Sequence, residues 1–170
     1  CDKMFVALYT EHIALKEVAK KIKTKPLTQF LIDFYNSVQP TSKVAVLGLN
    51  PHAGDNGVLG TEEKKIIKAI NNANNICDCF EGPFVPDTAF CEFNRNKYKY
   101  FIAMYHDQGL IPLKALHFDE SINVSLNLPI IRTSVDHGTA FDIAYKKDND
   151  KKISHKSYIN AIKEAVNLIP

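Results

Sequence analysis

Three of the six histidines stand where an apolar segment gives way to polar residues. They are His52 after Lys43–Leu49, His106 after Tyr98–Met104, and His137 after Ile130–Arg132. If these segments are parallel strands, their carboxyl ends meet at the sheet edge where α/β proteins bind ligands. Neutral imidazole suits zinc, cobalt or nickel, so this edge could hold a metal. The histidines form no local motif, so a hydrogen-bonded loop histidine is the alternative at each position.

A glycine-rich segment follows the first of these apolar runs. Gly54, Gly57 and Gly60 precede a predicted helix that begins at Thr61. The order of strand, glycine loop and helix suits phosphate binding, yet the segment lacks the close glycine pair of the dinucleotide fingerprint and the Gly-Lys-Ser/Thr of a P-loop. A loop that needs glycine only for its turns is an equally good interpretation.

Two cationic side chains are candidates for an anionic substrate. The guanidinium of Arg132 can pair with phosphate or carboxylate through two hydrogen bonds, and Lys114 can act as a movable point charge. A solvated surface charge is the alternative for both.

The elements that would position these residues alternate between strand and helix. Hydrophobic periodicity predicts strands at Met4–Tyr9, Lys43–Leu49, Tyr98–Met104, Ile122–Leu126 and Ile130–Arg132, with helices at His12–Ile22, Pro26–Ser37, Thr61–Asn75, Ala140–Tyr145 and Ser154–Leu168 and a helical turn ending at Leu116. Thr61 is the expected N-cap of its helix. Continuous apolar runs are typical of parallel strands that are covered on both faces. The pattern predicts the α/β class, with a loop through Gly82, Pro83 and Pro86.

Composition narrows the choice of partner. The 170 residues are 45% apolar and carry a formal charge of +2 with scattered lysines, which gives no footprint for nucleic acid or a membrane surface. We expect a cytoplasmic protein with a small-molecule partner. The four cysteines are expected to be free thiols, because Cys77 and Cys79 are too closely spaced for a zinc ribbon. The apolar segment at Met4–Tyr9 resembles a core strand, so we expect further chain before it.

Five longer motifs in this order resemble the 4-hydroxythreonine-4-phosphate dehydrogenase family of vitamin B6 biosynthesis. They are Leu-Asn-Pro-His-Ala-Gly-Asp at 49–55, Gly-Thr-Glu-Glu at 60–63, Gly-Pro-Phe-Val-Pro-Asp-Thr-Ala-Phe at 82–90, Ala-Met-Tyr-His-Asp-Gln-Gly-Leu at 103–110, and Leu-Pro-Ile-Ile-Arg-Thr-Ser-Val-Asp-His-Gly-Thr-Ala at 128–140. The resemblance covers most of the chain from about Thr10 onward.

The resemblance implies a divalent metal held by three histidines, which match His12, His52 and His106 here. It thus brings in His12 and removes His137 from the metal ligands. The Thr10-Glu11 pair before His12 departs from the family's usual run of hydroxyl residues. Zinc, cobalt, nickel, manganese and magnesium all remain open.

Further site residues follow from the same resemblance. The family's substrate contacts match Lys114, Asn123 and Arg132, and proton transfer is expected from Lys114 or Asp107. A loop similar to the cofactor loop of isocitrate and isopropylmalate dehydrogenases implies NAD or NADP binding. Its residues are His137, Gly138, Thr139, Ala140 and Asp142, with Phe141 where those enzymes favour proline. A helix start capped by Thr139 is the alternative.

The implied fold is a three-layer α/β/α arrangement with a largely parallel sheet, similar to isocitrate and isopropylmalate dehydrogenases. The implied reaction is metal-assisted oxidation of 4-phosphooxy-L-threonine by NAD, with loss of carbon dioxide from the product. Relatives acting on phosphorylated threonate or cyclic diols are one alternative, and an inactive metal- or cofactor-binding piece is another. We expect residues 1–170 to be the carboxy-terminal portion of a two-domain homodimeric enzyme, without the amino-terminal half that grips the substrate phosphate.

Overall fold

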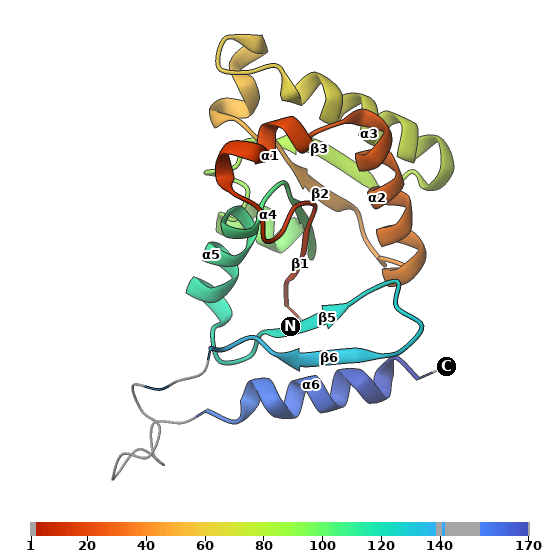
Figure 1. Cartoon of the computed structure of the whole chain (residues 1–170), viewed down its shortest axis with the longest axis vertical. Coiled ribbons are helices and arrows are strands. Elements are labelled where there is room, and N and C mark those ends of the chain that lie inside the picture. Colours follow the sequence, from red (N-terminus) through yellow and green to blue (C-terminus); the bar gives the residue numbers. More distant parts are fainter. Residues whose placement is uncertain (1–2, 139–140, 142–153, 170) are drawn as a thin grey trace. The chain divides into compact units, whose positions relative to one another are not determined.

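The structure, a computed structural model, describes residues 3–138, 141 and 154–169 (Figure 1). The chain divides into two compact units, which we call the first unit (Asp2–Pro112) and the second unit (Leu113–Pro170). Each unit has its own sheet. No helix among the described residues is long and apolar enough to cross a membrane.

The first unit is built on a four-stranded parallel sheet. Its strands are β1 (Phe5–Leu8), β2 (Val44–Leu47), β3 (Phe80–Phe84) and β4 (Tyr100–Ala103), in the order β1-β4-β2-β3. Every residue of the two central strands is buried. Because both faces of β2 and β4 are covered, their sequences are continuous apolar runs, and both strands were predicted on that ground.

Helices follow the strands in the first unit. They are α1 (Leu15–Lys21), α2 (Thr24–Val38), α3 (Glu62–Cys77), α4 (Glu92–Lys97) and α5 (His106–His117), which ends in the second unit. Helices α2 and α3 pack side by side (Figure 1). On α2, Leu27, Leu31 and Phe34 are buried at spacings of four and three residues, which place them on one helix face.

The second unit consists of an antiparallel two-stranded ribbon and one helix. Strands β5 (Ile122–Ser125) and β6 (Arg132–Val135) pair, and α6 (Lys156–Asn167) packs against both. The hydroxyl of Thr133 donates a hydrogen bond to the carbonyl of Ala161 at 2.8 Å, which fixes the helix to β6.

The α/β class with a mostly parallel sheet is confirmed, and the differences from prediction are local. Strand β3 and helix α4 were missed, because Gly82 and Pro83 are turn signals in sequence; proline is tolerated in β3 since it is an edge strand. The predicted helix from His12 begins only at Leu15.

One further prediction was right in part, one was wrong and one cannot be assessed. Thr61 occupies the N-cap position of α3 as predicted, but its side chain makes no capping hydrogen bond. The strand predicted to end at Arg132 begins there instead, because the residues that pair with β5 run from Arg132 to Val135. The predicted helix Ala140–Tyr145 falls almost wholly outside the described residues.

Candidate functional site

Three neighbouring strands of the first unit lead into the three histidines of the proposed metal set. His12 follows β1, His106 follows β4 and His52 follows β2, and these strands lie side by side in the order β1-β4-β2. Because the strands are parallel, their carboxyl ends share one edge of the sheet. His137 belongs to the second unit, where it follows β6.

The imidazoles of His12 and His106 lie close together. Their ring centroids are 5.5 Å apart and their planes are inclined by 45°. Two imidazoles that share one tetrahedral ion through bonds of about 2 Å have centroids roughly 5 Å apart. The spacing of this pair therefore fits a shared divalent ion.

Hydrogen bonds connect the strand ends that carry these histidines. The hydroxyl of Thr10 is buried and donates to the carbonyl of Met104 at 2.7 Å, which ties the segment before His12 to the end of β4. The side chain of Gln108 accepts from the amide of Met104 at 2.6 Å and donates to the carbonyl of Gly48 at 2.8 Å. Gln108 thus joins the ends of β4 and β2.

Asp107 is placed to orient the ring of His106. Its Oδ1 lies 2.7 Å from Nδ1 of His106. When Nδ1 carries the proton and donates it to this carboxylate, Nε2 keeps its lone pair for a metal, as is usual for metal-binding histidines. Asp107 is therefore better explained as an orienting group than as a proton carrier.

His52 lies on a segment with an unusual backbone. The 3-10 segment Pro51–Gly57 contains six successive residues with positive φ, from His52 to Gly57. Among the described residues, no three His, Cys, Asp or Glu side chains are grouped closely enough to hold a metal. The structure thus pairs His12 with His106, and His52 as the third ligand stays a prediction.

The segment that carries His52 is bordered by two carboxylates. Glu63 is buried and Glu62 is partly exposed, and both accept from the side-chain amide of Asn50. The hydrogen bond from Asn50, more than any other contact, lowers the pKa of Glu62 below its usual value. Glu62 is therefore held in its charged form beside the segment.

The predicted substrate residues all lie in the second unit. Lys114 donates to the carbonyl of Asp136 at 3.0 Å and lies 3.4 Å from its Oδ1. Asp136 Oδ2 is buried and accepts no hydrogen bond. Asp136 was missed by sequence reasoning, although it adjoins His137 in one of the five motifs.

Asn123 and Arg132 share one face of the β5–β6 ribbon. Ser125 pairs with Arg132 in the antiparallel register, and Arg132 donates to the Ser125 hydroxyl at 2.7 Å. Asn123 precedes Ser125 by two residues, which puts both side chains on the same face of the strand. Asn123 and Arg132 are exposed, so this face can receive a polar ligand.

The predicted cofactor loop is described only in part. His137 and Gly138 are exposed, and His137 Nδ1 lies 3.1 Å from the Gly138 carbonyl. Among the described residues, and leaving out its chain neighbours, no atom would lie within 4 Å of a Cβ added to Gly138. Thr139, Ala140 and Asp142 lie outside the described residues.

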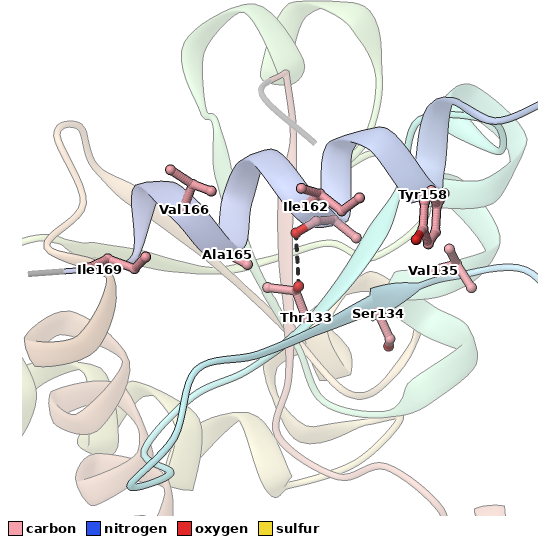
Figure 2. A pocket seen from close by; sticks show the side chains of 9 residues that line it. Thr133, Ser134, Val135, Tyr158, Ile162, Ala165, Val166 and Ile169 are labelled. Atoms are coloured by element: carbon pink, nitrogen blue, oxygen red, sulfur yellow. Dashed lines mark hydrogen bonds between the residues drawn. The ribbon is translucent and has the colours of Figure 1, made fainter.

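A groove between β6 and α6 does not match the expected substrate. Figure 2 shows Val135 of β6 facing Tyr158 of α6, with Ile162 and Val166 farther along the helix. None of the residues that line this groove is charged. A phosphorylated ligand would lose its hydration here without gaining an ionic partner.

Comparison with protein families matches residues 1–165 to "Pyridoxal phosphate biosynthetic protein PdxA". The chain is 70% identical over 171 aligned residues to the 4-hydroxythreonine-4-phosphate dehydrogenase of Sulfurimonas denitrificans, covering 99% of this chain and 54% of that protein. It is 51% identical to the enzyme of the same name from Helicobacter pylori strain J99, covering 96% and 52%. The chain spans about half the length of these relatives.

Solved structures also resemble this chain. A 4-hydroxythreonine-4-phosphate dehydrogenase from Klebsiella pneumoniae aligns with a TM-score of 0.80 at 35% identity, over 99% of this chain and 51% of that one. A terephthalate 1,2-cis-dihydrodiol dehydrogenase from Burkholderia xenovorans LB400 aligns with a TM-score of 0.69 at 25% identity, over 96% and 52%.

Proposed function

The chain belongs to the family of the pyridoxal phosphate biosynthetic protein PdxA. On that basis we propose that it contributes to the activity of a 4-hydroxythreonine-4-phosphate dehydrogenase. In the proposed reaction, 4-phosphooxy-L-threonine loses a hydride from carbon 3 to NAD or NADP. The product, 2-amino-3-oxo-4-phosphooxybutanoate, then loses carbon dioxide to give 3-amino-2-oxopropyl phosphate.

The observation that carries this proposal is the set of histidines after three adjacent parallel strands. His12 and His106 are spaced to share an ion, and Asp107 can fix the ring of His106. We propose His12, His52 and His106 as ligands of zinc, cobalt, nickel, manganese or magnesium. A bound divalent ion would act as a Lewis acid that makes the substrate alcohol more acidic.

The second unit supplies the proposed substrate contacts. Arg132 is suited to an anionic group, and Asn123 on the same ribbon face can donate or accept an orienting hydrogen bond. We propose Lys114 as the group that moves a proton at the reacting alcohol, with Asp136 holding its ammonium. For the cofactor we propose the segment from His137 through Gly138, Thr139 and Ala140 to Asp142.

Two wider expectations remain part of the proposal. They are a homodimer and a cytoplasmic location. The chain spans about half the length of the two relatives described above.

The test is an activity assay on a chimera. This chain would replace the matching segment of the Sulfurimonas denitrificans enzyme, which is 70% identical to it. NADH formation with 4-phosphooxy-L-threonine, lost on His106→Ala, would support the proposal. A chimera that folds and binds NAD but does not oxidise this substrate would contradict it. The same assay on the chain alone tests whether it is only a binding piece.

A second substrate class has a specific observation in its favour. The structure from Burkholderia xenovorans that resembles this chain is named for a cis-dihydrodiol. The chimera should therefore also be offered a cyclic cis-diol and phosphorylated threonate. Faster oxidation of either than of 4-phosphooxy-L-threonine would move the assignment to that substrate.

A further inference from the structure

The segment that carries His52 is held in a left-handed conformation. From His52 to Asn56 the φ angles are 52°, 50°, 81°, 42° and 55°, and only Gly54 in this run is a glycine. We call these residues the left-handed segment. A left-handed residue other than glycine is disfavoured because its Cβ lies too close to the following carbonyl oxygen, and Asn and Asp tolerate this conformation better than the others. The contacts around the segment must offset this cost.

Glu63, at the start of α3, accepts three hydrogen bonds from residues just before this segment. Its Oε1 accepts from the backbone amides of Leu49 at 3.0 Å and Asn50 at 2.7 Å. Its Oε2 accepts from the side-chain amide of Asn50 at 2.9 Å. One buried carboxylate thus fixes the chain where it leaves β2 and enters the left-handed segment.

Two glycines allow the segment to close over this carboxylate. A Cβ at Gly54 would lie 2.6 Å from Oε2 of Glu63, and a Cβ at Gly60 would overlap the side-chain amide of Asn50. Both positions have positive φ, at 81° and 157°. Gly54 and Gly60 therefore pack against Glu63 and Asn50, which explains these two glycines without a bound phosphate.

We propose that Glu63 is a positioning residue that acts through Asn50 and the left-handed segment to hold His52 for metal binding. The inference rests on the metal role proposed above for His52. Glu63 lies on the same face of α3 as Ile66 and Ile70, since the spacings are three and seven residues. A carboxylate on the buried face of a helix needs partners, and here it finds them in the chain that leads to His52.

The charge of Glu63 distinguishes it from a glutamine of the same shape. Asn50 Nδ2 donates to both Glu63 and Glu62, so it cannot turn its carbonyl toward position 63 without facing the carboxylate of Glu62. In Glu63→Gln the carbonyl still accepts from the backbone, but the new amide meets the Asn50 amide, donor against donor. We expect the segment to loosen while the rest of the first unit keeps its fold.

The experiment compares Glu63→Gln with Asn74→Ala. The side chain of Asn74 brackets Phe80 by two hydrogen bonds of 2.8 and 3.0 Å, so its loss weakens the first unit at a different place. The first readout is amide hydrogen exchange at Leu49 and Asn50 in metal-free protein, and the second is the dissociation constant for Co²⁺. His52→Ala gives the affinity expected without this ligand.

The proposal predicts about tenfold faster exchange at Leu49 and Asn50 and about tenfold weaker Co²⁺ binding in Glu63→Gln, with neither change in Asn74→Ala. Gly60→Ala, which displaces Asn50 and keeps Glu63, should reproduce both effects if Glu63→Gln does not fold. Unchanged exchange, or faster exchange with native Co²⁺ affinity, would overturn the positioning role. If His52→Ala keeps native affinity, the metal role of His52 is wrong and the positioning role falls with it.

Discussion

The two units of this chain differ in how well each covers its own apolar surface. In the first unit all residues of β2 and β4 are buried. In the second unit α6 buries Ser157 and Ala161, while Tyr158, Ile162 and Val166 stay more than half exposed. A two-stranded ribbon with one helix is also at the lower limit of a stable sheet.

The two proposed roles, metal binding and substrate binding, fall in different units. The histidines belong to the unit with the well-buried parallel sheet, where Thr10 and Gln108 tie the strand ends together. The proposed substrate residues lie in the sparsely packed unit. A metal site needs ligands fixed to within a fraction of an ångström, so the first unit is the better scaffold for it.

The same substitution in both units should give the clearest contrast. Ile102 in β4 is 0% exposed and Ile162 in α6 is 51% exposed. We expect Ile102→Ala to lower the free energy of unfolding by about 2–5 kcal/mol and Ile162→Ala by less than about 1 kcal/mol, measured by urea denaturation. Equal losses would mean that Ile162 is covered in solution, and the contrast between the units would fail.

Arg132→Ala should raise KM for 4-phosphooxy-L-threonine by about 10- to 100-fold, because a charged hydrogen-bond donor is lost from the proposed substrate face. Metal content should not change, since the proposed ligands belong to the other unit. Arg95→Ala is the matched control, because the guanidinium of Arg95 donates a hydrogen bond to the Phe90 carbonyl in the first unit. Unchanged kinetics in the Arg132→Ala chimera would remove Arg132 from the substrate site.

Asp136→Asn should lower kcat/KM by about tenfold, because Lys114 loses its ionic partner. Steady-state kinetics of the chimera would measure it, and Asp119→Asn in the exposed turn after α5 is the control. Binding of Co²⁺ should remain native in both variants. A loss of metal binding in Asp136→Asn would show that the two kinds of chemistry are not separated as proposed.

The smallest expected effect concerns pH in the first unit. The Tyr98 hydroxyl donates to Glu81 and holds the pKa of that carboxyl below its usual value, with Lys97 contributing less. A lowered folded pKa adds stability above the unfolded pKa, and this is lost as the pH falls through the folded value.

Tyr98→Phe should therefore lower stability by less than about 1 kcal/mol at neutral pH, since Glu81 is more than a third exposed, and should lower it less at about pH 3. Urea denaturation at both pH values measures the difference. Tyr158→Phe, on the exposed face of α6, should show no such dependence on pH. Equal losses at both pH values in Tyr98→Phe would show that packing alone is involved.

Features with a local sequence signal could be predicted, and features that depend on contacts between distant residues could not. Strands β2 and β4 were predicted because burial on both faces leaves an unbroken apolar run. The left-handed segment could not be predicted, because Glu63, which binds the two residues Leu49 and Asn50 just before it, lies on the following helix. The pairing of His12 with His106 depends on the order of the strands, since β1 and β4 are neighbours in the sheet but far apart in sequence.

Family resemblance added what periodicity could not. His12 precedes the first regular turn of α1, and only the family resemblance identified it as a candidate ligand. Glu63 and Asp136 both lie within matched motifs, yet the sequence did not identify them. Their proposed roles depend on three-dimensional contacts. A buried charge on the apolar face of α3 was the one available signal for Glu63.

The most direct test of the account is zinc content by elemental analysis after loading and desalting. The native chain should hold close to one equivalent, and His12→Ala and His106→Ala should each lose most of it, while His137→Ala in the second unit should match the native chain. Zinc content that is unaffected by His12→Ala and His106→Ala would contradict the assignment of a metal site to the carboxyl ends of β1 and β4.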